Sequence, residues 1–265
     1  LLKGVEFRRP FRTLTWREAM SRYGTDKPDL RFGLELRDFS SVFAGSQVKV
    51  FANVLGRKGV VKGLTVSGQE FSRKELEDLT SFVSGYGAKG LAWIRLTDAE
   101  WQSPIAKFLT PDERAGILRV AEAKSGDFVF FIAGDEKIVN EALANLRLHL
   151  GERLGLRQDE AYEVLWVVDF PLFEYDAVEK RLLSVNHPFT APLEEDLDLL
   201  VENPAQVRSK AYDLVLNGTE IGGGSIRIHQ VGLQRQVFDL LGIGAEEAEE
   251  KFGFFLEALR YGTPP

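Results

Sequence analysis

Cysteine is missing from the chain of 265 residues, which excludes disulfides, thiolate metal sites and cysteine nucleophiles. Histidine is scarce, and its three residues are scattered without a zinc-binding spacing. Long apolar runs are absent as well, since none approaches the roughly 20 residues that span a bilayer. The first residues lead into charge rather than into a signal-type apolar segment. We therefore expect a cytoplasmic protein.

The composition is that of a folded protein, with 44% hydrophobic and 28% charged residues. The length allows one large domain or two ordinary ones. A net charge of -7 argues against indiscriminate nucleic-acid coating, which needs clustered Lys and Arg. P-loop, nucleophile-elbow, zinc-protease and dinucleotide-binding signatures are all missing, so any use of nucleotides must follow another pattern.

Helix starts are marked by capping boxes, in which a Ser or Thr is followed three residues later by Glu. They occur at residues 15–18, 72–75 and 110–113. The first two helices should end near Gly24 and Gly85, and Pro111 suits the first position of the third. Two longer helices are predicted over residues 136–154 and 245–261, with Gly155 and Gly262 as their stops.

Strands are predicted where β-branched and aromatic residues gather. The segments are 48–54, 59–66, 90–96, 127–133, 163–169, 212–216 and 225–228. Strands mixed with helices in this way indicate an α+β fold with a largely antiparallel sheet. Residues 38–156 can close as a two-layer α+β module, inserted between segments 1–37 and 157–265 of another domain. A plain two-domain chain is the alternative.

Residues 211–229 (AYDLVLNGTEIGGGSIRIH) are the most informative stretch. The glycine triplet forms either a simple turn or a place where another molecule approaches the backbone. Asp213, Glu220 and Arg227 surround it at equal spacing, and turns at residues 217–218 and at the triplet could bring them to one side. Two carboxylates suit magnesium on nucleotide phosphates, and a planar guanidinium suits a substrate carboxylate.

A second candidate is His187, because the following proline restricts it to extended geometry and fixes the direction of its ring. A lone histidine is more often only hydrogen-bonded, so the residues themselves favour no functional role here. Residues 165–173 read as a buried strand that leads into an aromatic-rich turn, with core packing as its default role.

These stretches resemble the bacterial-type aspartyl-tRNA synthetases, a class II family. The resemblance rests on residues 211–229, 186–190, 166–172, 23–31 and 251–265, and it extends over essentially the whole chain. It implies a portion of the catalytic domain, with an antiparallel sheet flanked by helices. Residues 38–156 look like the inserted module that these enzymes share with the B subunit of the tRNA-dependent amidotransferase.

The resemblance implies an aspartate–tRNA ligase, which joins L-aspartate to ATP as aspartyl-adenylate and then passes the aspartyl group to tRNA. By this resemblance Glu220 binds ATP, chiefly through Mg²⁺ held with Asp213, and Arg227 holds the side-chain carboxylate of aspartate. Glu220 and Arg227 would be the catalytic residues. Asn186 and His187 would help bind the substrate, although Asn186 replaces the first member of a histidine pair found in many relatives.

The family pattern also contains parts that the sequence lacks: an anticodon-binding barrel, a dimer-forming first motif, a second motif with an arginine for the α-phosphate, and a third motif. We therefore expect a portion of a longer, homodimeric enzyme that makes no adenylate by itself. The alternative is a non-catalytic RNA-binding or interaction module built around residues 38–156. Such a module would not need Glu220, the glycine triplet or Arg227.

Overall fold

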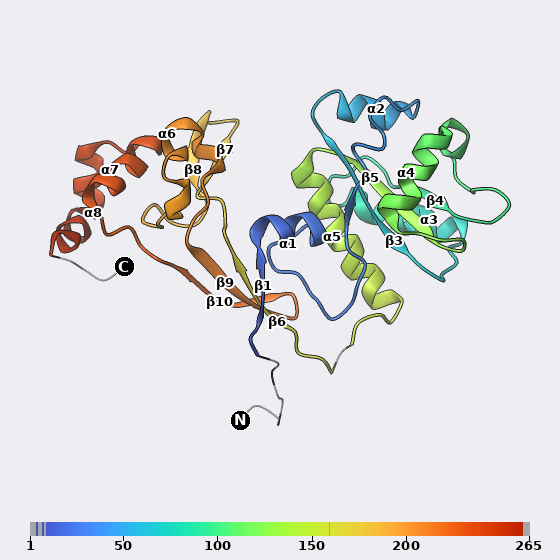
Figure 1. The fold of residues 1–265 in the computed structure, drawn as a ribbon, viewed down its shortest axis with the longest axis horizontal. Coiled ribbons are helices and arrows are strands. Elements are labelled where there is room, and N and C mark those ends of the chain that lie inside the picture. The colour runs from blue at the N-terminus through green and yellow to red at the C-terminus, as the bar shows by residue number, and fades with distance from the viewer. Residues whose placement is uncertain (1–3, 5–6, 8, 159, 262–265) are drawn as a thin grey trace. The chain divides into compact units, whose positions relative to one another are not determined.

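The computed structural model describes residues 4, 7, 9–158 and 160–261 (Figure 1). Contacts divide the chain into two compact units. The continuous unit is Glu18–Glu163, and the split unit consists of the chain up to Arg17 together with the chain from Val164 onward. The module limits expected from the sequence, at residues 38 and 156, stay a prediction.

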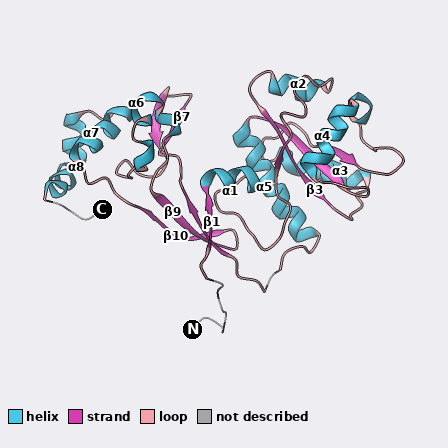
Figure 2. Cartoon of the chain, viewed as in Figure 1, coloured by secondary structure: helices cyan, strands magenta, loops and turns pink. Residues whose placement is uncertain are grey.

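The described residues of the continuous unit hold one four-stranded antiparallel sheet. In spatial order its strands are β2 (Arg37–Asp38), β3 (Val60–Val66), β5 (Phe128–Gly134) and β4 (Ala92–Arg95). The helices are α1 (Trp16–Tyr23), which begins at the boundary of the unit, α2 (Lys49–Leu55), α3 (Arg73–Ser84), α4 (Pro111–Ala121), α5 (Glu136–Arg153) and the short 3₁₀ turn Ala106–Phe108. Figure 2 shows helices and strands mixed along the chain, which confirms the α+β class.

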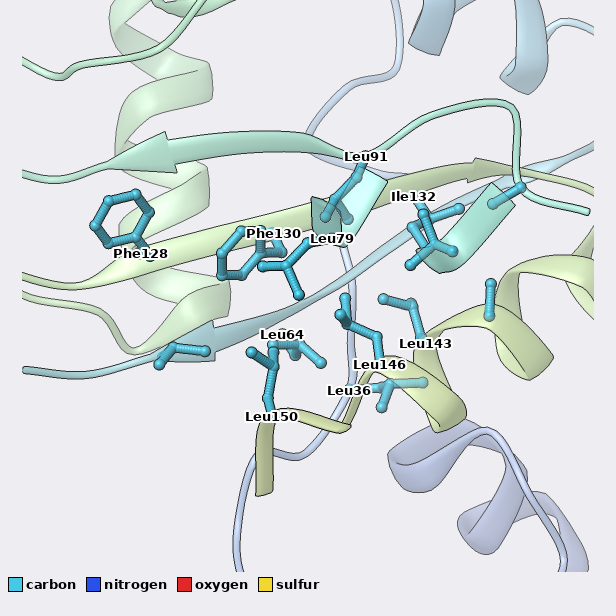
Figure 3. Packing of buried hydrophobic residues seen from close by; sticks show 14 of the residues in the cluster. Leu36, Leu64, Leu79, Leu91, Phe128, Phe130, Ile132, Leu143, Leu146 and Leu150 are labelled. Atoms are coloured by element: carbon cyan, nitrogen blue, oxygen red, sulfur yellow. The ribbon is translucent and has the colours of Figure 1, made fainter. Parts of the chain in front are cut away.

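Helices cover both faces of this sheet. Phe128 and Phe130 of β5 pack into a cluster with leucines of α3 and α5 (Figure 3). Val129 and Phe131 point to the opposite face and pack with residues of α2 and α4. Because both alternating sets along β5 are apolar, neither face can meet water. The unit is therefore three-layered, and the expected two-layer arrangement is wrong.

Residues 49–54 belong to a helix, α2, which Val48 precedes as its N-cap, and not to the strand predicted over 48–54. Val48 and Phe51 are buried three positions apart, as on one face of a helix, whereas Val50 between them is 63% exposed. The β-branched residues favoured a strand, but packing of this helical face onto the sheet decided the structure.

The predicted helix starts are confirmed. Ser72 and Thr110 each accept a hydrogen bond from the amide of the glutamate three residues on, and both glutamates bond back to the cap amide. Helix α1 ends before Gly24, whose φ is +71°, and α5 ends before Gly155, whose φ is +62°. Gly85 follows α3 in a right-handed conformation, so the left-handed residue there is Gly87.

The described residues of the split unit also contain a four-stranded sheet, in the order β1 (Arg12–Thr15), β6 (Val164–Val168), β9 (Ala211–Leu216) and β10 (Thr219–Ser225). Only the β1–β6 pair among them is parallel. A separate hairpin joins β7 (Phe173–Asp176) and β8 (Arg181–Ser184). The helices are α6 (Leu199–Glu202), α7 (Val231–Leu240) and α8 (Ala245–Arg260), with 3₁₀ turns at Glu194–Asp196 and Pro204–Gln206.

The strand predicted over 225–228 is wrong. β10 ends at Ser225, and beyond it Arg227 forms an isolated bridge. The glycine triplet lies inside β10. Glycine has little intrinsic preference for a strand, so hydrogen bonding to β9 keeps this part of the backbone extended. Helix α8 confirms the last predicted helix, whose stop at Gly262 lies outside the described residues. Within the described ranges, none of the helices has the length and apolar character needed to cross a membrane.

Candidate functional site

The candidate site is built on the hairpin of β9 and β10 (Figure 1). Asn217 and Gly218 form its turn, with φ values of +52° and +83°. Two consecutive positive φ angles are the geometry of the tight turns that match the twist of paired strands, and Asn-Gly is the sequence that adopts them most readily. The turn predicted at these two residues is thus confirmed, while the turn predicted at the glycine triplet is wrong.

Asp213 and Glu220 gather over the backbone of Gly223. The register pairs Gly223 directly with Asp213, and a shift between Glu220 and Gly222 moves Glu220 relative to β9. A Cβ added at Gly223 would overlap Oδ1 of Asp213 and lie 3.2 Å from Oε1 of Glu220. The two carboxylates therefore lie close together in space that only a glycine leaves open.

Arg227 lies beside the segment that carries the predicted histidine. The residue forms an antiparallel bridge with Thr190, and the guanidinium Nη1 is 3.5 Å from the Thr190 hydroxyl. The same hydroxyl lies 3.1 Å from Oγ of Ser225. Thr190 is 1% exposed, so its position is fixed by packing. One buried hydroxyl thus connects the end of β10 with the arginine.

His187 lies close enough to Arg227 for the charge of the arginine to affect its pKa. Its Nδ1 accepts a hydrogen bond of 3.3 Å from the amide of Phe189, and its ring lies 5.5 Å from the Phe189 ring. Burial lowers the pKa of His187 below its usual value, and the positive charge of Arg227 lowers the pKa further. Both effects favour the neutral form of the imidazole. Asn186, the preceding residue, is exposed.

The geometry of β10 places the two acids on the same side of the sheet as Arg227. Side chains two apart on β10 share a face, so the face that carries Ser225 is also that of Gly223 and of its partner Asp213. The Thr190 hydroxyl then places Arg227 on the side of Ser225. The acids form one pair, and the arginine and histidine form a neighbouring one. That all four contact a shared ligand stays a prediction.

Magnesium is the cation that this donor set fits. Mg²⁺ is commonly held by one or two carboxylates, with the remaining positions taken by waters and substrate phosphates. Asp213 and Glu220 supply such a pair of hard oxygen donors. Within the described part of the chain there is no group of three or more His, Cys, Asp or Glu residues that would make an all-protein metal cage.

Sequence reasoning missed the residues that hold the Thr190 segment in place. Arg208 donates from Nε and Nη2 to the buried carboxylate of Asp196, at 2.8 and 2.9 Å. Backbone bonds from Leu193 to Arg208 and from Lys210 to Ala191 extend the same connection. The pairing of residue 196 with residue 208 joins separate loops, so no local pattern marks it.

The chain belongs to the class II tRNA synthetases of the D, K and N group, whose family model matches residues 1–265. The resemblance of its motifs to that class is thereby confirmed.

Individual relatives are more specific. The aspartate–tRNA(Asp/Asn) ligase of Desulfatibacillum aliphaticivorans is 55% identical over 264 residues, which cover 99% of this chain and 44% of that protein. The corresponding ligase of Natranaerobius thermophilus is 52% identical over 99% of this chain and 45% of its own length. An aspartyl tRNA synthetase structure from Entamoeba histolytica matches 78% of this chain and 37% of its own, at 12% identity and a TM-score of 0.28, too low to support a statement about the fold. The chain spans less than half the length of the curated relatives it matches.

Proposed function

We propose that this chain is a portion of an aspartate–tRNA ligase, which activates L-aspartate with ATP and transfers the aspartyl group to tRNA. The carrying observation is the identity of 52–55% to ligases of that name over nearly the whole chain. The site supports it independently, because a pair of acids and a neighbouring arginine suit the two substrates of the first step.

The acids serve the nucleotide. Asp213 and Glu220 would hold Mg²⁺ against the phosphates, and the Gly223 backbone leaves room for both carboxylates. The ion, when bound, neutralises phosphate charge that develops as pyrophosphate leaves. In the same step a carboxylate oxygen of aspartate attacks the α-phosphorus of ATP.

The arginine serves the amino acid. Its planar fork can hold both oxygens of the aspartate side chain. Thr190 orients Arg227, and the neutral ring of His187 offers hydrogen bonding without a second positive charge; the exposed amide of Asn186 supplies a further polar contact. Asparagine would leave the guanidinium facing a neutral amide, so the site would reject it.

The remaining parts of the proposal concern the complete protein. The names of the relatives include both aspartate and asparagine tRNA, which supports a substrate tRNA of that dual class. A homodimer and a cytoplasmic location follow from the family resemblance. Charging of purified tRNAs and the mass of the complete protein in solution test the first two.

Arg227→Lys in the full-length protein tests the site. Lysine keeps the charge but loses the fork, so kcat/KM for aspartate should fall by about 10²–10³-fold in aspartate-dependent pyrophosphate exchange, with little change in the KM for ATP. Arg235→Lys, at an exposed position on α7, is the matched control. Unchanged aspartate kinetics would remove Arg227 from the site, and no exchange by the wild-type protein would reject the activity itself.

A further inference from the structure

A cavity of about 500 Å³ opens on the continuous unit, and none of the candidate-site residues lines it. Its lining comes from three segments: α2 and the turn that follows it, the turn after α3, and the end of β5 with the start of α5. Three of the lining residues are cations, Arg57, Lys58 and Lys89, and all three side chains are exposed.

Acidic side chains of the described residues do not neutralise these three cations. No ion pair is recorded for Arg57, Lys58 or Lys89 among the residues that the structure describes. The acidic residue of the described lining is Asp135, whose carboxylate caps α5 by accepting a 3.0 Å hydrogen bond from the amide of Lys137. A local excess of positive charge therefore stands out in a chain whose net charge is -7.

Three residues of the lining are glycines: Gly59, Gly87 and Gly134. A Cβ at Gly59 would lie 2.6 Å from the carbonyl oxygen of Gly134, so these two segments approach as only glycine allows. Gly87 contributes a turn with a φ of +84°. The lining thus combines long cationic side chains with glycine backbone.

The lining of the cavity is better suited to a polyanion than to a small molecule. Pockets for small molecules place a few buried polar groups precisely around the ligand, whereas the charged side chains here are all exposed. Val50 and Ile138 add apolar surface at 63% and 38% exposure. The described lining contains no aromatic ring, so it offers contact to charge and sugar without base stacking.

We propose that this cavity binds the phosphodiester backbone of tRNA. The inference rests on the proposed ligase function, which supplies the RNA, and it assigns the continuous unit a part in holding that RNA. Three flexible cations around an open surface suit phosphates spaced along a strand, and they read no base edges. The contact should therefore be equal for tRNAs of different sequence.

The test is a triple variant of the full-length protein, Arg57→Gln with Lys58→Gln and Lys89→Gln. Binding of tRNA should weaken by about tenfold or more at low salt, and the slope of log K against log salt concentration should drop by about 2–3. The loss should be the same for a non-cognate tRNA. Aspartate-dependent pyrophosphate exchange without tRNA should not change, because none of the three residues belongs to the aspartate or ATP site.

A control variant removes the same charge elsewhere on this unit: Lys74→Gln with Lys107→Gln and Lys124→Gln, all exposed and outside the cavity. This control should keep both the affinity and the salt slope. Arg57→Lys with Lys58→Arg and Lys89→Arg keeps the charge and should bind as wild type. Equal loss in the control and test variants, or no loss in either, overturns the inference while exchange still reports the ligase activity. Absence of exchange in the wild-type protein would instead overturn the proposed function.

Discussion

β5 and β10 are strands of equal length, seven residues each, that lie in different units and carry opposite kinds of side chain. β5 reads FVFFIAG, and its first five residues are buried. β10 reads TEIGGGS, and its first five residues are exposed. One strand thus organises a core from both of its faces, while the other presents backbone and carboxylates to the surroundings.

The difference shows how stability and chemistry are distributed along this chain. Burial of large apolar side chains supplies the free energy of folding, and β5 carries five of them in a row, from Phe128 to Ile132. The glycines of β10 bury almost nothing, so that hairpin depends on its ladder with β9 and on the turn at Asn217. A strand that contributes little to the core is free to shape a site.

Phe131→Ala sharpens the comparison most strongly. The ring is fully buried and lies 4.9 Å from the Phe39 ring and 5.6 Å from the Phe43 ring. Its removal should lower the free energy of unfolding of the continuous unit by about 3–5 kcal/mol, because a cavity replaces the ring. Urea unfolding measures this. Phe108→Ala, at a ring that is 44% exposed, should cost less than about 1 kcal/mol.

An equal loss from both phenylalanine variants would show that β5 is not the centre of the core. A loss at Phe131 that leaves pyrophosphate exchange intact at low temperature would confirm that the strand acts through stability alone.

Gly223→Ala and Gly222→Ala give the opposite test on β10. The added methyl at Gly223 would overlap the Asp213 carboxylate, whereas nothing lies within 4 Å of a Cβ at Gly222. Displaced acids should lower kcat/KM for ATP by about 10²-fold in exchange assays of the full-length protein, and Gly222→Ala should stay near wild type. Neither substitution should lower the melting temperature, since alanine suits an exposed strand better than glycine does.

If both glycine variants keep full activity, the two carboxylates do not act on the nucleotide. If both lose activity together with stability, β10 supports the fold in the manner of β5, and the contrast between the two strands fails.

Local patterns predicted the parts of the fold that depend on neighbours in sequence. The capping boxes at Ser72 and Thr110 are examples, because the partners stand three residues apart. The strand prediction for residues 48–54 was wrong, because the helix there is stabilised by packing against a sheet formed by distant residues. The three layers of the continuous unit were not predicted for the same reason, although the unbroken apolar run in β5 indicates that both faces of the sheet are covered.

The site divides in a similar way. The spacing of Asp213, Glu220 and Arg227 correctly indicated this stretch as the site. The two carboxylates come close because Gly223 has no side chain between them, and not because the chain turns there. The contact of Thr190 with Ser225 spans 35 residues of sequence. No local pattern encodes it, so only the paired backbone reveals it.

The smallest expected effect concerns an ion pair, between Arg208 and Asp196, that joins two loops of the split unit. The side-chain hydrogen bond from Arg208 lowers the pKa of Asp196 below its ordinary value of 3.8. Because this carboxyl has a lower pKa when folded, its contribution to stability is complete above pH 3.8 and is lost as the pH falls through the lower, folded-state value. Asp196→Asn should therefore destabilise the Thr190 segment by about 1–2 kcal/mol at neutral pH, seen as faster hydrogen exchange at the amide of Arg208, which donates to that carboxylate at 2.9 Å. The difference from wild type should shrink as the pH falls below 3.8, and the neighbouring exposed Asp198→Asn should change neither exchange nor its pH dependence. A difference that stays constant down to low pH would mean that the carboxylate charge does not hold the loop, and that the split unit relies on packing in the same way as β5.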